Sequence, residues 1–330
     1  MNDDLSPGSL REIVYSFQKS RIILTAFELK IFTVLSGSRK SSEDTALAVQ
    51  CDIRATDRLM NALVAIGLLK KEEKQFSNTV TAETYLVEGK PGYLGGLHHT
   101  SNMWQNWTTL TEAVQKGKSV TRTTNRSNDM KWSEAFIAAM HYRAKNQAAA
   151  IIEHIDLSHV KKLLDLGGGS GVYSMAFVTA KPEIKAVVFD LPHIVPITRD
   201  YIDNEGYTGS VEIMPGNYLF DDFGSGYDLI FMSAIVHINS YNENLQLIGR
   251  CARALNQGGQ IIIQDQIMND DRTLPAGGAL FALNMLVGTD SGDTYTETEM
   301  KEWFKSAGIS DIVRVDGAFE SMQLIGRKRS

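Results

Sequence analysis

The stretch "LLDLGGGSG", Leu163 to Gly171, decides the fold class of this chain of 330 residues. An apolar run ends at Asp165, a glycine-rich turn follows, and a helical segment opens near Ser170. Glycines let the backbone turn sharply and let a ligand come close to it. Because ligands of open α/β sheets bind beyond the carboxyl ends of the strands, the stretch predicts a ligand site at this turn.

The spacing of the glycines separates two classes of cofactor. A dinucleotide pattern G-x-G-x-x-G that starts at Gly167 requires a glycine at position 172, which is Val172; the third glycine is Gly171 instead. Asp165, just before the glycines, suits a ligand with an ammonium group better than one with a pyrophosphate. The sequence therefore disfavours a nicotinamide dehydrogenase, which is kept only as an alternative.

Short apolar runs alternate with helical segments from Lys161 onward. The runs predicted to be parallel strands are "KKLLDLG", "KAVVFDL", "SVEIMP", "YDLIFMS" and "GQIIIQD". They are almost continuously apolar, as strands covered by helices on both faces are. The alternation predicts βαβ units and a doubly wound α/β sheet. The segments "DIVRVDG" and "FESMQLIGRK" predict a closing pair of strands.

The N-terminal part has a different pattern. Apolar residues recur at helical spacing from Leu10 to Leu35, and they are too numerous for a lone surface helix. Two further helical segments, Ser42 to Val49 and Ala55 to Ile66, precede two short strands in "LLKKEEKQFSNTVTAE". This order resembles a winged helix. The second helical segment is mostly apolar, which favours a dimerisation module over a DNA reader.

These patterns divide the chain into three predicted parts. Residues 1–95 form a winged-helix-like dimerisation domain, and residues 159–330 form the ligand-binding α/β domain. Between them, residues 96–158 read as a helical connector that contributes to a substrate pocket. Its apolar anchors are Trp104, Trp107, Leu110, Trp132, Phe136 and Met140.

Composition narrows the classes of partner. The formal net charge is -6, whereas nucleic-acid binding needs clustered Lys and Arg, so we expect no nucleic acid as partner. Cys51 and Cys251 are far apart, and no Asp, Glu or His cluster has metal-ligand spacing, so neither a disulfide framework nor a metal site is expected. The start of the chain lacks a signal-peptide pattern, and no apolar run could span a bilayer. We therefore expect a cytoplasmic enzyme that contacts no membrane.

Three further residues lie at predicted strand ends. Asp190 follows the glycine-rich loop by about 20 residues, where a carboxylate meets a ribose diol in nucleotide folds; it could instead cap a helix. His237 follows the strand "YDLIFMS" and is a candidate general base, unless it is a structural histidine. Asp265 ends the next strand and could orient that imidazole, or be a loop carboxylate without such a contact. Ser240 and Glu243 form a capping-box pattern after the histidine.

The segments "DLGGGSG", "FDLPHIV", "PGNYLF" and "ALNQGG", in this order, resemble the plant and bacterial small-molecule O-methyltransferase family, which includes acetylserotonin and caffeic acid O-methyltransferases. The resemblance covers nearly the whole chain. It implies a Rossmann-like catalytic domain, a homodimer formed through the N-terminal domain, and S-adenosylmethionine as cofactor. The cofactor site that it and the loop predict consists of Asp165, Gly167, Gly169, Asp190, Leu191, Asn217, Tyr218 and Ser233.

The resemblance also implies roles around the reaction. His237 matches the catalytic histidine of the family, Asp265 matches a glutamate that supports it, and Met140 falls where a methionine borders the substrate. The predicted activity is methyl transfer to a hydroxyl of a small aromatic or heterocyclic molecule, with no metal.

The chain also departs from the pattern of the family. The usual His-Asp-Trp reads His237-Ile238-Asn239, and a second supporting acid is replaced by Thr294, before Tyr295. Asn217 stands in place of an aspartate, and Ser233 where plant members have a lysine. These changes leave the cofactor prediction intact. They leave open a C- or N-methyltransferase that uses the same cofactor site.

Overall fold

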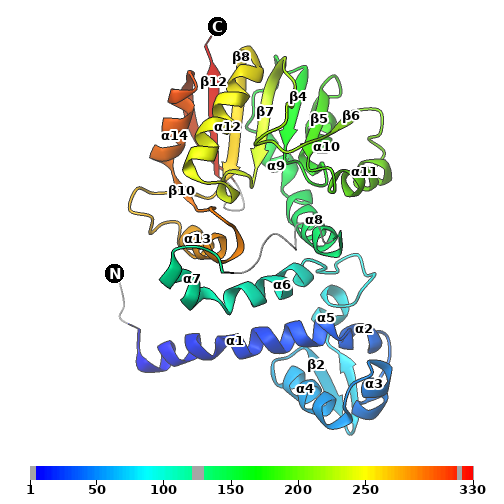
Figure 1. Ribbon diagram of the computed structural model, residues 1–330. Coiled ribbons are helices and arrows are strands. Elements are labelled where there is room, and N and C mark those ends of the chain that lie inside the picture. The colour runs from blue at the N-terminus through cyan, green and yellow to red at the C-terminus, as the bar shows by residue number, and fades with distance from the viewer. Residues whose placement is uncertain (1–4, 121–129, 318–321, 330) are drawn as a thin grey trace. The chain divides into compact units, whose positions relative to one another are not determined.

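The computed structural model describes residues 5–120, 130–317 and 322–329 (Figure 1). The chain splits into two compact units, Met1–Ser101 and Asn102–Ser330, and helix α6 (Leu97–Trp107) crosses the boundary between them. Within the described ranges, no helix combines the length and the apolar character needed to cross a membrane. The finer division at residues 95 and 158 remains a prediction.

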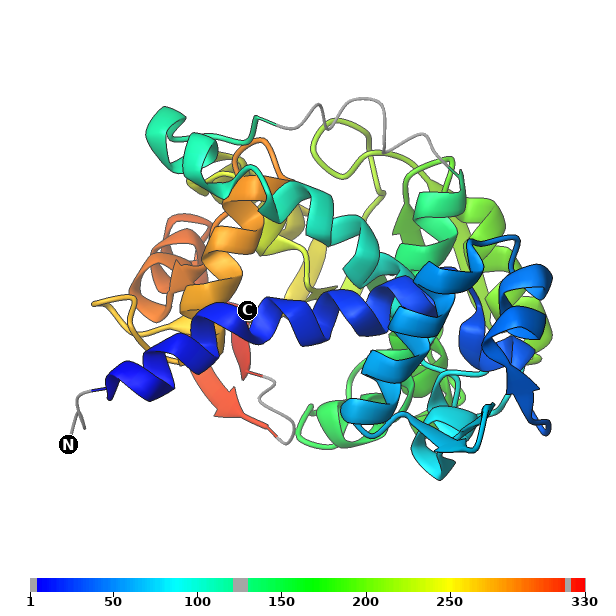
Figure 2. The same ribbon diagram turned by 90° about the horizontal axis from the view of Figure 1, so that it is seen from below.

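The first unit begins with a long helix, α1 (Pro7–Glu28), which Figure 2 shows along its whole length. The Ser6 side chain caps it by accepting a hydrogen bond from the backbone N–H of Ser9. The helical periodicity predicted from Leu10 to Leu35 is shared with a second helix, α2 (Ile31–Val34). The break arises because Lys30 adopts a left-handed backbone conformation, with φ of 58°.

The rest of the first unit has the predicted order of a winged helix. Helices α3 (Ser42–Ala48) and α4 (Ile53–Ala65) are followed by strands β2 (Leu69–Glu72) and β3 (Gln75–Asn78). A strand too short to be seen in the sequence, β1 (Lys40–Ser41), completes an antiparallel sheet in the order β1-β3-β2. Helix α5 (Val80–Tyr85) follows, and the buried centre includes Phe27, Phe32, Met60, Leu63 and Phe76.

The second unit is built on a seven-stranded sheet in the order β11-β12-β8-β7-β4-β5-β6. The predicted parallel strands all form and pair in parallel with one another. They are β4 (Lys162–Leu166), β5 (Lys185–Asp190), β6 (Val211–Pro215), β7 (Tyr227–Ser233) and β8 (Leu255–Asp265). The predicted closing pair of strands also forms, as β11 (Ile309–Asp316) and β12 (Met322–Lys328), and the structure pairs them in antiparallel fashion.

Helices cover both faces of this sheet (Figure 1). On one face lie α9 (Ala148–Ile152), α10 (Val172–Ala180) and α11 (Val195–Asn204). On the other lie α12 (Tyr241–Ala254) and α14 (Glu297–Ser306). Each side buries its own apolar cluster, which explains the nearly continuous apolar strands. The capping box predicted for Ser240 and Glu243 is present at the start of α12.

The remaining elements lie beyond the carboxyl ends of the parallel strands. They include helices α7 (Leu110–Lys116), α8 (Met130–Lys145) and α13 (Ala276–Gly288). Both views show α7 beside α13 (Figures 1 and 2), and Trp107 Nε1 donates to Asn284 Oδ1 at 3.0 Å. The short strands β9 (Ile267–Met268) and β10 (Tyr295–Thr296) pair in parallel. They bring the segment before α14 to the end of β8.

Candidate active site

The glycine-rich loop connects β4 to α10 and adopts a conformation that side chains resist. Gly167, Gly169 and Gly171 have φ of 68°, 55° and 73°, in the region that favours glycine. At Gly167 space is also limiting, because an added Cβ would lie 2.2 Å from Cδ1 of Ile235. The backbone N–H of Gly167 donates to the carbonyl oxygen of Phe189 at 2.8 Å, which fixes the loop against β5.

Asp165 lies beneath this loop and is almost completely buried. Its Oδ2 accepts hydrogen bonds from the hydroxyl of Ser174, at 2.8 Å, and from the backbone N–H of the same residue, at 3.2 Å. Burial raises the pKa of Asp165 to about 7, the bonds from Ser174 oppose this rise, and the nearby charge of Asp190 adds to it. The carboxylate therefore supports the loop from below, and its contact with a ligand stays a prediction.

Asp190 reaches from the end of β5 to the same loop. Its Oδ2 accepts from the backbone N–H of Gly169 at 2.8 Å, and its Oδ1 accepts from that of Leu191 at 2.7 Å. The following helix, α11, begins at Val195 with Ile194 as its N-cap, so Asp190 does not cap it. Burial raises the pKa of Asp190, although the two N–H donors lower it.

Tyr218 also lies against the loop. The nearest atom of its ring is 3.8 Å from the position that a Cβ on Gly167 would take. The segment that carries it turns at Asn217, whose Oδ1 accepts from the backbone N–H of Leu219 at 2.9 Å. Arg250 of α12 holds the segment by donating to the carbonyl oxygens of Tyr218, at 2.7 Å, and of Asp221.

The other predicted ligand contacts are more dispersed. Ser233, at the end of β7, lies near the hydroxyl of Tyr173 on α10, which accepts a hydrogen bond from Nε2 of Gln264 at 2.8 Å. Leu191 packs against an apolar cluster of α8 and α11 residues. Met140 is half-buried on α8 and directly precedes His141. The roles of all three at a cofactor or substrate remain predictions.

His237 and Asp265 form a buried pair at the ends of neighbouring strands. His237 lies in the short 3-10 turn η2 (Val236–Ile238) after β7, and Asp265 is the last residue of β8. The Nδ1 of His237 is 2.8 Å from Oδ1 of Asp265, and the side chains are 11% and 3% exposed. The ring of Phe281 meets the imidazole edge to face, with 4.8 Å between centroids. Because the carboxylate occupies Nδ1, Nε2 is the ring nitrogen that remains able to accept a proton.

The backbone of this turn is fixed by the segment before α14. The N–H of Asp293 donates to the carbonyl oxygen of His237 at 3.0 Å. Gly292 lies so close that an added Cβ would be 2.4 Å from the same oxygen. Thr294, where the resembling family has an acid, is buried and offers its carbonyl oxygen to Arg272 at 2.6 Å.

The loop and the histidine pair belong to one site. Ile235, which packs against Gly167, lies two residues before His237. Ala234, immediately after β7, has φ of 58°, a strained conformation for a residue other than glycine. This sharp turn brings the chain from the end of β7 back over the glycine-rich loop.

Sequence reasoning missed the residues that hold the loop from the side of α8. Nδ1 of His141 is 3.0 Å from the hydroxyl of Ser170, and its ring stacks on Tyr201 with centroids 4.3 Å apart. Thr198 donates to the carbonyl oxygen of Gly169 at 2.6 Å. Burial lowers the pKa of His141, and the charge of Lys145 adds to this effect. No motif signals these contacts, because α8 and α11 are distant from the loop in sequence.

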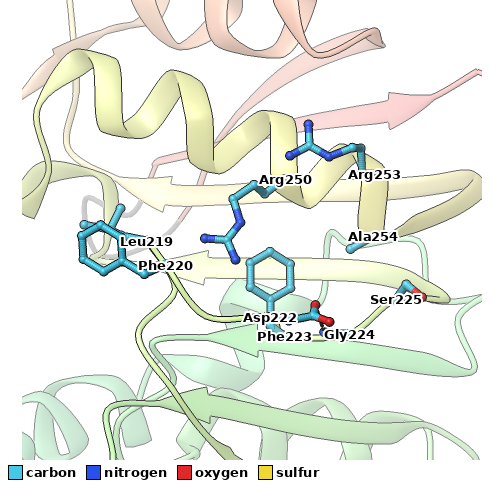
Figure 3. Close-up of a pocket in the computed structure, with 9 residues that line it drawn as sticks. All are labelled: Leu219, Phe220, Asp222, Phe223, Gly224, Ser225, Arg250, Arg253 and Ala254. Atoms are coloured by element: carbon cyan, nitrogen blue, oxygen red, sulfur yellow. Dashed lines mark hydrogen bonds between the residues drawn. The ribbon is translucent and has the colours of Figure 1, made fainter.

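A surface groove elsewhere on the second unit is lined by Arg250 but by none of the predicted site residues. It lies between the segment after β6 and helix α12, and Figure 3 shows Arg250 over the ring of Phe223. The guanidinium carbon is 5.0 Å from the ring centroid. The arginine thus supports the segment of Tyr218 from outside, and the groove is separate from the histidine pair.

Comparisons with known proteins match both parts of the chain. A family model described as an O-methyltransferase domain matches residues 107–310, and one described as an O-methyltransferase dimerisation domain matches residues 12–88. The former range covers more than half of the chain and includes every residue of the site described above. The resemblance predicted from the sequence motifs is confirmed.

Individual relatives span the chain almost completely. It is 28% identical over 312 residues to a 3-hydroxy-5-methyl-1-naphthoate 3-O-methyltransferase of Streptomyces sahachiroi, covering 93% of this chain and 90% of that protein. It is also 28% identical to an L-tyrosine C(3)-methyltransferase of Streptomyces lavendulae, over 77% of this chain and 68% of that protein. A solved structure described as PigF with SAH superposes with a TM-score of 0.91, at 25% identity, over 98% of this chain and 100% of the other.

Proposed function

Given that the chain belongs to the O-methyltransferase family, we propose that it methylates a hydroxyl of a small aromatic or heterocyclic molecule, with His237 as general base. The enzyme is an S-adenosylmethionine-dependent methyltransferase. When bound, this cofactor supplies a methyl group made electrophilic by a sulfonium sulfur. The observation that carries the proposed base is the buried His237–Asp265 pair beside the glycine-rich loop.

The residues around the loop fit such a cofactor. Asp165 and Asp190 are two buried carboxyl groups, and within the described ranges neither forms an ion pair with a lysine or arginine. A ligand that brings positive charge would relieve the cost of charging them. The glycine-rich loop and the two oxygens of Asp190 suit the close approach of a nucleoside with a ribose diol. We propose that Tyr218 borders its base.

His237 would take the proton of the acceptor hydroxyl on Nε2. Asp265 accepts a hydrogen bond from Nδ1–H, which selects the tautomer with a free Nε2 and stabilises the imidazolium that forms. The edge-to-face contact with Phe281 orients the ring, and the N–H of Asp293 fixes the backbone of His237. A base held in this way typically contributes 10² to 10⁴-fold to a rate.

A C- or N-methyltransferase is the alternative, and two observations favour keeping it. The relative that acts on carbon has the same 28% identity to this chain as the one that acts on oxygen, although over 77% of the chain instead of 93%. The second acid that supports the histidine elsewhere in the family is Thr294 here. A carbon or nitrogen nucleophile depends less on removal of a hydroxyl proton.

The proposed partners are a small-molecule acceptor and a second copy of the chain, with no nucleic acid and no membrane. On α1, the exposed residues Leu10, Ile13, Val14 and Phe17 recur at helical spacing and so line one face. Such a face is costly to leave in water, and it overlaps the dimerisation domain of the family model. We propose that it is buried in a homodimer.

Two experiments test the proposed activity. Calorimetry should show binding of S-adenosylhomocysteine and no competition by NAD; binding of NAD alone would contradict the cofactor assignment. A screen of phenolic and heterocyclic acceptors with methyl-labelled cofactor, followed by mass spectrometry and NMR of the product, identifies the methylated atom. A methyl group found only on carbon or nitrogen would replace the proposed O-methylation by the alternative.

A further inference from the structure

Asn239 is a buried polar residue at a position where the resembling family has tryptophan. It is 3% exposed and makes bonds to three other parts of the second unit. Its Oδ1 accepts from the hydroxyl of Tyr218 at 3.2 Å, and its Nδ2 donates to Oδ1 of Asn244 at 3.1 Å. Its carbonyl oxygen accepts from the hydroxyl of Tyr295 at 2.6 Å. A tryptophan at this position has no side-chain acceptor for the hydroxyl of Tyr218.

These bonds converge on the turn that carries His237. Asn239 directly follows η2, and the side chain of Asn244 also donates to the carbonyl oxygen of Val236, at 2.8 Å. A buried amide that loses its partner is costly, because its desolvation is then uncompensated. The turn therefore has a strong preference for the arrangement in which the whole network is satisfied.

The other end of the network lies at the glycine-rich loop. The ring of Tyr218 faces Gly167, while its hydroxyl reaches Asn239. Burial raises the pKa of Tyr218 to about 12, so its hydroxyl remains a neutral donor at physiological pH. A single side chain thus has its ring at the proposed cofactor site and its hydroxyl on the turn of the proposed base.

We propose that Asn239 is a positioning residue that links occupancy of the cofactor site, sensed at Tyr218, to the orientation of His237. The proposal rests on the proposed function, because it takes His237 as the base and Tyr218 as a neighbour of the cofactor. A ligand that contacts the tyrosine ring changes the direction of the bond from its hydroxyl. The asparagine transmits this change to the turn. By the same linkage, a change in the orientation of His237 alters the affinity of the cofactor site.

The test is NMR of protein labelled with ¹⁵N-histidine, titrated with S-adenosylhomocysteine. The ring signals of His237 are identified by their loss in His237→Gln. In the wild type we expect saturation to shift them. Tyr218→Phe, which removes one hydroxyl, should reduce this shift by more than half while changing the Kd by less than about threefold. Tyr241→Phe is the matched control, because that hydroxyl bonds to Glu302, outside the network.

Equal shifts in the wild type and Tyr218→Phe, or no shift in the wild type, would overturn the link. Tyr295→Phe provides a second variant, expected to act in the same direction.

With the best acceptor of the screen, Tyr218→Phe should lower kcat by about 2- to 12-fold, the range of one net hydrogen bond, with KM for the cofactor nearly unchanged. A purely structural role would lower the Tm and leave the NMR response intact. Failure of the proposed base is seen separately, as normal turnover of His237→Ala.

Discussion

The Nδ1 atom of His237 lies 2.8 Å from Oδ1 and 3.0 Å from Oδ2 of Asp265, although the residues are 28 positions apart. The parallel pairing of β7 with β8 creates this contact, because Ser233 and Gln264, near the strand ends, are register partners. The pair is the arrangement in which a carboxylate fixes the tautomer of a general base.

Replacement of this pair tests its role directly. His237→Ala should lower kcat by roughly 10² to 10⁴-fold and leave cofactor affinity nearly intact, because only the base is removed. Asp265→Asn should cost less, since it disturbs the orientation of the ring. The losses should not add in the double variant, because the two residues act as one unit. Steady-state kinetics measures all three, and the exposed His154→Ala is the control. Near-normal turnover of His237→Ala would make the histidine structural.

Asp190→Ala should weaken cofactor binding by about 1.5–3 kcal/mol, or roughly 10- to 150-fold in Kd, the range for bonds to a charged group. The substitution removes the proposed ribose contact and also frees the N–H of Gly169. Calorimetry with S-adenosylhomocysteine measures the change, and the exposed Asp200→Ala on α11 is the control. An unchanged Kd in a folded variant would show that Asp190 only supports the loop.

Gly292→Ala should displace the turn of His237. The new Cβ would lie 2.4 Å from the carbonyl oxygen of His237 and 3.0 Å from that of Ile238, and backbone atoms cannot rotate away. We expect kcat to fall at least tenfold while the Kd for S-adenosylhomocysteine changes little. Gly277→Ala, on α13 with open space around the position, should be neutral or slightly stabilising. Wild-type kcat in Gly292→Ala would mean that the turn adapts without effect on the base.

The buried carboxyl of Asp165 predicts a pH-dependent stability. In the folded protein it keeps its proton up to about pH 7, whereas the ordinary value is 3.8. Between these values the folded state binds more protons than the unfolded chain, so this contribution to stability falls as pH rises through about 7. The side chain of Asp165→Asn stays neutral at every pH. From pH 5 to pH 8 the Tm of the ligand-free variant should therefore rise relative to that of the wild type, by several degrees.

Scanning calorimetry at a series of pH values follows this difference, with Asp200→Asn as the exposed control. The hydrogen bonds from Ser174 can still reach an amide oxygen, which keeps the loop supported in the variant. A difference in Tm that is the same at every pH would show that Asp165 does not titrate in this range.

The proposed dimer can be tested by the molecular mass of the protein in solution. Light scattering at micromolar concentration should give about twice the chain mass of 36.5 kDa. Ile13→Glu and Phe17→Glu should shift the protein toward the monomer, because each places a charge on the apolar face of α1. Tyr15→Glu changes a comparably exposed residue on another side of the same helix and is the control. A wild type of monomer mass would contradict the dimer.

Much of the fold follows from local sequence. Apolar runs of strand length, separated by helical segments, specify the parallel sheet because strands covered on both faces have few polar residues. The glycines at 167, 169 and 171 mark the loop, since all three adopt backbone conformations that other residues resist. Asp190, His237 and Asp265 could be singled out because each ends or follows a strand. Their roles in the reaction remain predictions.

Other features depend on contacts that no local pattern contains. The network of Asn239 joins Tyr218, Asn244 and Tyr295, and a buried asparagine in a sequence looks the same as an exposed one. The close approach of Gly292 to His237 depends on the pairing of β9 with β10, two strands of two residues each. Sequence by itself thus determined the strands of the main sheet and the glycine-rich loop, because propensity and periodicity act over neighbouring residues. Only the tertiary structure decided which polar groups meet, because each must find a partner from another element once it is buried.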